Sequence, residues 1–135
     1  MTDRREFRQL SRLRQDDAKA LLDAGRWAGS YYLMGYAVEC ALKACIVRRF
    51  KSHTLPDQNL VRSIYTHELD RLLKIAELEL ALRAEPLIDL NWTIVKDWSE
   101  QKRYLALVDE YAARDMYGAC TKPRQGVLPW LRKHW

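Results

Sequence analysis

One long segment, apolar on almost every side, constrains this chain more than any other feature. It spans about residues 27–49, where small and large apolar residues occupy all faces of a helix and only Glu39 and Lys43 interrupt them near the middle. A helix that is apolar all round must be surrounded by other elements. A membrane-spanning helix needs about 20 mostly apolar residues without such charges. We therefore expect the central helix of a bundle, and no membrane protein.

Helical spacing continues on both sides of this segment. Apolar residues recur every three to four positions over residues 4–24, and Gly25 follows where a left-handed C-terminal cap is expected. After a long connection, Thr66 is a candidate N-cap for a third helix that Pro86 ends or interrupts. A short helix up to Trp98 follows.

The last part of the chain predicts two more helices. Ser99 is a plausible cap for a helix over residues 100–117, and Gly118 and Pro123 are expected to break the chain after it. A final short helix would carry Pro129 in its first turn. The fold class is therefore all-α: an antiparallel bundle of four to six helices, formed by a single domain over residues 1–135.

The composition supports one globular core. Hydrophobic residues make up 48% of the 135 positions and charged residues 30%, and no stretch is poor enough in apolar residues to predict a disordered tail. The N-terminus has no apolar segment typical of a secretory signal, so we expect a cytoplasmic protein.

Positive charge is concentrated near the N-terminus. The net charge is +5, and the first fourteen residues hold five arginines: Arg4, Arg5, Arg8, Arg12 and Arg14. A polyanionic partner is one explanation. Because acidic residues interleave with these arginines, solvated helix faces are the other explanation, and charge alone does not choose between them.

Cysteine and histidine spacing gives no support for a metal centre or a cofactor. Cys40, Cys45 and Cys120 form no metal-binding pair, and the first two lie inside the apolar helix, so buried thiols are expected. The histidines, His53, His67 and His134, are scattered without ligand spacing.

The central helix carries one polar-tipped stripe, formed by Tyr32, Tyr36, Glu39 and Lys43. Glu39 and Lys43 are four residues apart in the favourable order for an intrahelical ion pair. The stripe can line a cleft that binds a ligand, or its members can satisfy one another at a bundle or dimer interface. Both interpretations stay open at this level.

Residues 35–44 (GYAVECALKA) closely resemble the second-helix signature of HEPN-domain proteins. The likeness extends to residues 20–27 (ALLDAGRW), to Ser30, Tyr31 and Tyr32, to residues 66–69 (THEL) with Leu72 and Leu73, to Trp98 and Ser99 with Arg103 and Tyr104, and to residues 126–130 (GVLPW). It covers about residues 7–135. The order of glycine, tyrosine, glutamate and lysine in the central string is not demanded by generic helix packing.

The resemblance implies an antiparallel helical bundle similar to nucleotidyltransferase substrate-binding subunits, usually a homodimer. It also implies binding of nucleotide or RNA and a small nucleotidyltransferase as protein partner, in a toxin–antitoxin-like or defence-related system. The ligand-binding candidates are Tyr32, Tyr36, Glu39, Lys43, His67, Arg103 and Tyr104. Arg103 beside an aromatic ring suits phosphate contact with base stacking.

Some HEPN proteins are metal-independent RNases that use an arginine and a histidine four to six residues apart. Arg62 and His67 match this spacing, with histidine as acid or base and arginine steadying the phosphate. Arg48 and His53 match it too, and the RNase motif usually lies later in the bundle. Three functions therefore stay open: a non-catalytic binding module, an RNase, and an interaction scaffold without a ligand.

Overall fold

The computed structural model describes residues 3–50, 62–98 and 108–135. These ranges contain only helices and no strand, which confirms the all-α prediction. The helices are α1 (Arg4–Asp23), α2 (Trp27–Phe50), α4 (Leu69–Ile75), α5 (Glu79–Arg83), α6 (Pro86–Val95), α7 (Glu110–Thr121) and α8 (Val127–Leu131). They exceed the expected four to six within the described ranges, in part because one expected helix is divided in two.

The hairpin of α1 and α2 follows the sequence signals closely. Asp3 caps α1 through a capping box, in which its carboxylate accepts from the Glu6 backbone N–H at 2.8 Å and the Glu6 carboxylate accepts from the Asp3 N–H at 3.2 Å. Gly25 has φ +75°, a left-handed conformation that reverses the chain after α1. The predicted glycine cap is confirmed.

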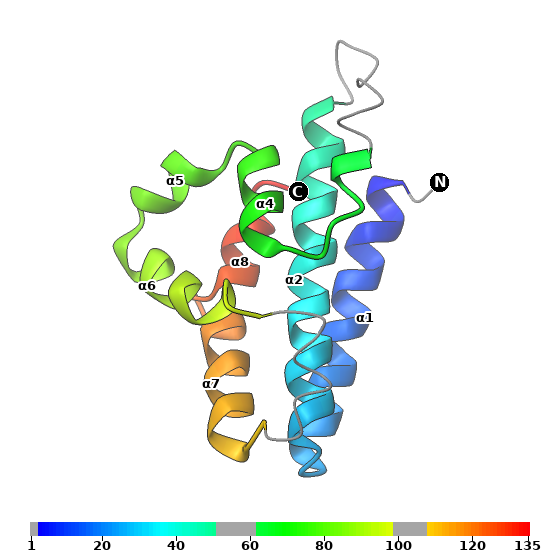
Figure 1. The fold of residues 1–135 in the computed structure, drawn as a ribbon, viewed down its shortest axis with the longest axis vertical. Coiled ribbons are helices and arrows are strands. Elements are labelled where there is room, and N and C mark those ends of the chain that lie inside the picture. The colour runs from blue at the N-terminus through cyan, green and yellow to red at the C-terminus, as the bar shows by residue number, and fades with distance from the viewer. Residues whose placement is uncertain (1–2, 51–61, 99–107) are drawn as a thin grey trace.

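Helix α2 is the centre of the molecule, as its apolar sequence predicts. It contacts α1 along its length and also packs against α4, α7 and α8. Figure 1 shows α1 and α2 as long neighbouring rods, with α7 and α8 on the other side of α2 and α4 across its upper half. Two buried serines join the hairpin, because Ser11 donates to the Ala37 carbonyl and Ser30 to the Ala18 carbonyl.

Gly35 allows one close approach on α2. A Cβ atom at this position would stand 2.1–2.2 Å from atoms of the Trp98 indole, which follows α6 and is buried. The sequence suggests tight packing here against a neighbouring backbone. The structure corrects the identity of the neighbour: a tryptophan ring, not a backbone, lies against Gly35.

The expected third helix is divided into α4 and α5. Glu77 takes φ +57°, and Leu78 N–H bonds to the Leu73 carbonyl while Glu77 N–H bonds to the Lys74 carbonyl, which closes α4 as a Schellman motif does. No glycine or proline marks this break. Arg49, at the end of α2, donates to the Ile75 carbonyl at 2.7 Å and pairs with the Glu77 carboxylate at 2.5 Å. Both contacts stabilise the turn that ends α4.

Two further details differ from the sequence predictions. Thr66 does not cap α4, because the N-cap is Glu68, whose N–H donates to the Thr66 hydroxyl in a local turn. Gly118 does not break the chain, since it lies inside α7, and a Cβ atom added there would meet open space. Ser99, the other predicted cap, lies outside the described residues.

The C-terminal helices close the bundle. Asp109 caps α7 by accepting from the Ala112 N–H, and Pro123 follows the end of α7 as expected. Helix α8 has Pro129 in its first turn, and Trp130 and Trp135 are both buried. Among the helices of the described ranges, none has the length and apolar character that crossing a membrane requires.

Candidate functional site

The centre of the candidate site is the Glu39 carboxylate, which has only 1% of its surface exposed. One oxygen lies 3.2 Å from Lys43 Nζ, one helical turn further along α2, which confirms the predicted pair. The other oxygen lies 2.7 Å from Nδ1 of His67, which precedes α4. Residues 28 positions apart in sequence therefore meet at one buried carboxylate. We refer to Glu39, Lys43 and His67 as the Glu39 triad.

The triad fixes the chemistry of the histidine. An ionised carboxylate only accepts hydrogen bonds, so Nδ1 of His67 must donate to Glu39. The neutral ring then has its basic nitrogen at Nε2. The His67 side chain is 44% exposed, whereas the Glu39 side chain is 2% exposed. A buried carboxylate therefore binds a partly exposed imidazole. This arrangement holds the ring in one orientation.

A cleft of about 280 Å³ lies against the triad. Its walls come from α1, from α2 and from the turn before α4, and its lining residues are Phe7, Leu10, Tyr36, Glu39, Cys40, Lys43, Ile64 and Tyr65. The lining combines aromatic, aliphatic and charged groups, which is typical of small-molecule sites. Tyr65 is 65% exposed and stands at the rim. We call this space the Glu39 cleft.

The predicted polar stripe of α2 is divided between two environments. Tyr36 lines the Glu39 cleft beside Glu39 and Lys43. Tyr32 is not among the lining residues, and its ring packs 5.9 Å from the Trp98 ring and 6.3 Å from the Tyr36 ring, centre to centre. Tyr32 therefore packs between the rings of Tyr36 and Trp98, outside the cleft lining.

Burial raises the pKa of two side chains on the α2 wall of the cleft, Tyr36 and Cys40. Burial, together with the nearby Glu39 charge, raises the pKa of the Cys40 thiol to about 12. Burial also raises the pKa of Tyr36, with Cys40 and Glu39 adding in the same direction. Both groups are thus protonated at neutral pH, and Cys40 offers no thiolate nucleophile.

Arg14 is a cleft neighbour that the sequence did not single out. Its guanidinium acts on both Tyr36 and Cys40, lowering the pKa of each, so it lies near this wall. It also lies 3.4 Å from the Asp17 carboxylate. Phe7, Leu10 and Tyr65 were missed as well, because only the packing of α1 and the pre-α4 turn on α2 brings them together; helical spacing on α1 was the available signal.

The catalytic pair of the RNase hypothesis is only partly brought to the cleft. His67 belongs to the triad, but Arg62 is exposed, and no hydrogen bond or ion pair joins it to His67 in the described structure. Arg103, Tyr104 and His53 lie outside the described residues. These assignments stay predictions.

The remaining cysteines are buried, as predicted. Cys45 and Cys120 are at most 5% exposed, and burial raises the pKa of both thiols, that of Cys45 to about 12. In the ranges that the structure describes, no three His, Cys, Asp or Glu side chains gather as a metal site would require.

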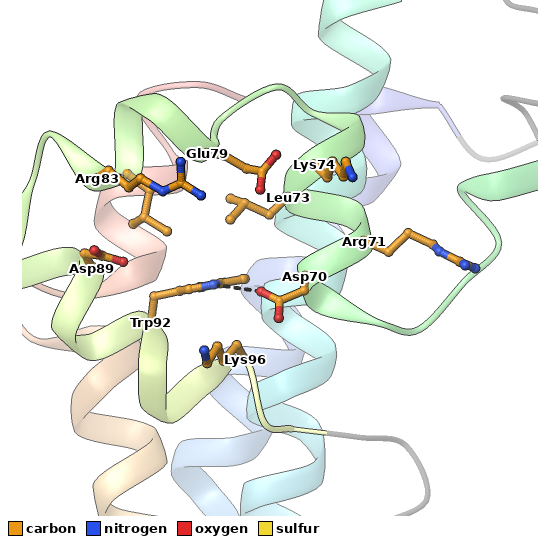
Figure 2. A pocket seen from close by; sticks show the side chains of 10 residues that line it. Asp70, Arg71, Leu73, Lys74, Glu79, Arg83, Asp89, Trp92 and Lys96 are labelled. Atoms are coloured by element: carbon orange, nitrogen blue, oxygen red, sulfur yellow. Dashed lines mark hydrogen bonds between the residues drawn. The ribbon is translucent and has the colours of Figure 1, made fainter.

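A second cavity, of about 510 Å³, lies among α4, α5 and α6 (Figure 2). Trp92 forms part of its wall, and its indole N–H donates to the Asp70 carboxylate at 3.1 Å. Figure 2 shows Lys74, Glu79 and Arg83 above this indole and Lys96 below it, whereas Arg71 extends away. Charges of both signs alternate around this cavity, so it selects no single class of ligand.

Comparison of the chain with models of protein families, with curated proteins and with solved structures finds no match.

Proposed function

We propose that this chain is a HEPN-like helical module that binds a nucleotide or an RNA segment in the Glu39 cleft. The observation that carries the proposal is the Glu39 triad: the buried Glu39 carboxylate, in the wall of an aromatic-rimmed cleft, contacts both the Lys43 ammonium and the His67 imidazole. The Lys43 ammonium has further N–H groups besides the one given to Glu39, and these suit an anionic ligand group.

The lining of the cleft supports the choice of ligand. Tyr36 and Tyr65 offer ring surfaces on which a nucleobase can stack, and such stacking contributes about 1–3 kcal/mol per base. Lys43 and the nearby Arg14 supply positive charge for a phosphate. A volume of about 280 Å³ is near the lower end for small-molecule sites, which favours one nucleotide unit over an extended ligand.

Titration calorimetry with ATP and with a short single-stranded RNA at low salt tests this function. We expect Tyr65→Ala and His67→Ala to weaken binding about tenfold, because the first removes a ring at the rim of the cleft and the second removes the hydrogen-bond partner of Glu39 in the cleft wall. Tyr111→Ala is the matched control, since Tyr111 is 78% exposed on α7 and does not line the cleft. If the folded wild-type protein binds neither ligand, the proposal fails.

The resemblance also supports an assembly, which belongs to the same proposal. We expect a homodimer and a small nucleotidyltransferase as protein partner, in a toxin–antitoxin-like or defence-related system. Light scattering measures the mass in solution, and a monomer at micromolar concentration would contradict the dimer. Mixing with a purified small nucleotidyltransferase from the same genome tests the partner, and the absence of a complex would contradict it.

A second candidate function is metal-independent RNA cleavage with His67 as the base. The Glu39–His67 bond favours it, because a buried carboxylate that orients an imidazole is a common way to prepare a general base. Nε2 of His67 would take the proton of a 2′-hydroxyl, whose oxygen bonds to the adjacent phosphorus while the bond to the 5′-oxygen breaks and that oxygen takes a proton from water. Arg62 would steady the phosphate charge.

Incubation of purified protein with RNA in EDTA separates the two functions. Cleavage products ending in a cyclic 2′,3′-phosphate, lost in His67→Ala and reduced in Arg62→Ala, would support the RNase. Intact RNA with wild-type protein, or cleavage that His67→Ala leaves unchanged, would rule it out while leaving the binding function standing.

A further inference from the structure

Three arginines on one flank of α1 converge on Trp135. The guanidinium carbons of Arg8 and Arg12 lie 5.2 Å and 5.0 Å from the centre of the Trp135 ring. Arg4, one turn before Arg8, donates from Nε to the Trp135 carbonyl at 2.7 Å. Arg132, which follows α8, lies 5.7 Å from the same ring centre. The indole is 4% exposed, so it supports the arginines from beneath.

Two more cations extend this cluster. Arg48, in the last turn of α2, and Lys133 are both exposed. Burial lowers the pKa of His134, whose ring packs on Trp130, and the charges of Arg48 and Lys133 lower it further. Burial raises the pKa of the Cys45 thiol, and the charges of Arg48 and Arg4 both oppose this shift. We define the basic platform as Arg4, Arg8, Arg12, Arg48, Arg132 and Lys133. In Figure 1, the start of α1 and the C-terminal end of the chain lie at similar height.

The acidic residues of α1 do not neutralise the platform. Glu6 is engaged with Asp3 in the capping box, and Asp17 and Asp23 pair with Arg14 and Lys19. Asp16 acts on Arg132, but burial and the neighbouring Arg12 outweigh it and lower the Arg132 pKa. In the described residues, no platform cation forms an ion pair with an Asp or Glu side chain within 4.0 Å.

Like charges gathered in this way oppose folding unless something else favours them. Placing guanidinium groups side by side costs Coulomb energy, which a bound polyanion would return. The three α1 arginines recur every four residues, a rise of about 6 Å per step. This spacing resembles that of successive phosphates along an extended strand, and a guanidinium forms paired hydrogen bonds with phosphate oxygens.

We propose that the basic platform binds the phosphate backbone of a single-stranded nucleic acid, without sequence preference. The absence of sequence preference follows from Trp135, which is buried and thus offers no ring face to a base. The platform is separate from the Glu39 cleft, because Leu10 and Arg14 turn the other flank of α1 toward that cleft. The proposal therefore stands whether or not the cleft binds a nucleotide.

Fluorescence anisotropy with a labelled oligouridylate over a series of salt concentrations tests the platform. Each lost phosphate contact lowers the slope of log K against log salt by about 0.7 for a single strand. We expect Arg8→Gln/Arg12→Gln to reduce the slope by about 1.4 and to weaken binding at least tenfold at low salt. Arg71→Gln/Arg83→Gln, which removes the same charge from α4 and α5, is the matched control and should change the slope little.

A second variant guards against loss of the fold. Arg48→Gln/Lys133→Gln leaves the contacts to Trp135 in place and should lower the slope by a similar amount, with an unchanged thermal midpoint. If both platform variants keep the wild-type slope, or the control lowers it equally, the proposal is wrong. Wild-type protein that binds phosphatidylglycerol vesicles but no oligouridylate would also overturn it.

The platform proposal and the proposed function can fail independently of each other. ATP carries its base and phosphates in one small molecule and tests the Glu39 cleft alone, so His67→Ala should affect ATP binding, and the platform variants should not. Loss of ATP binding with retained oligouridylate binding would reject the cleft function and keep the platform.

Discussion

At the scale of single residues, Gly35 is the position where the structure tolerates least. Replacement by alanine would place a Cβ atom 2.1–2.2 Å from the Trp98 ring, which must then move. We expect Gly35→Ala to lower the free energy of unfolding by about 1–3 kcal/mol or more. Gly118→Ala is the control, because nothing lies within 4 Å of its Cβ, and it should raise stability by about 0.5–1 kcal/mol. Urea unfolding measures both, and equal shifts would contradict the packing.

The Glu39–Lys43 pair makes a second residue-scale prediction. Glu39→Gln leaves the Lys43 ammonium, in a residue only 8% exposed, without its countercharge, and breaking such a buried pair costs about 3–5 kcal/mol. The double change Glu39→Gln/Lys43→Met removes both charges and should recover much of this loss. Unfolding in urea gives the double-mutant cycle. A double variant as unstable as the single one would contradict an ion pair, and a double variant that still binds ATP would show that the pair stabilises the bundle without contacting the ligand.

At the scale of elements, the sequence predicts the long helices better than the short ones. Residues 4–24 and 27–49 were expected to be helical and agree with α1 and α2 within a residue, because the apolar period is long and Gly25 marks the turn. The division between α4 and α5 was not predicted from the sequence. Glu77 takes a left-handed conformation that is usual for glycine, and the ion pair with Arg49, 28 residues earlier in the chain, stabilises Glu77 in it. Such tertiary support leaves no local mark in the sequence.

The candidate site, too, was predictable only where its residues lie on one helix. The Glu39–Lys43 pair follows from spacing on one helix, which the sequence contains in full. The approach of His67 to Glu39 depends on how the segment before α4 returns to α2, and so do the rim positions of Phe7 and Tyr65. Contacts between distant segments depend on how the helices pack, and the spacing of residues along one helix does not predict that packing.

Within the described ranges, two non-glycine residues with positive φ provide an element-scale test. Glu77 and Arg124 have φ of +57° and +66°, a conformation that costs most residues about 1 kcal/mol. Arg124→Gly, after α7, should therefore raise the free energy of unfolding by up to about 1 kcal/mol. Glu77→Gly should gain less, because it also removes the ion pair with Arg49. Chemical denaturation compares the two, and a larger gain at position 77 would contradict a stabilising role for that pair.

At the scale of the whole molecule, the buried thiols link stability to alkaline pH. Burial raises the pKa of Cys40 and Cys45 to about 12 and also raises that of Cys120, from an ordinary value of 9.0 for each thiol. A raised folded pKa means that the unfolded chain releases its protons first as the pH rises. The stability is thus fully present below pH 9 and is lost between about pH 9 and 12, by up to about 1.4 kcal/mol per pH unit for each thiol.

Urea unfolding at a series of pH values under reducing conditions measures this loss. Tyr31 and Tyr36, whose pKa values burial also raises, add to it in the same direction, so the test compares variants instead of absolute slopes. Cys120→Ala removes the thiol without adding a charge, and its free energy of unfolding should fall less steeply above pH 9 than that of the wild type. Parallel slopes for the two proteins would mean that the Cys120 thiolate is tolerated in the fold. A shallower slope would show that the core around α2 and α7 excludes charge, as the burial of Cys120 requires.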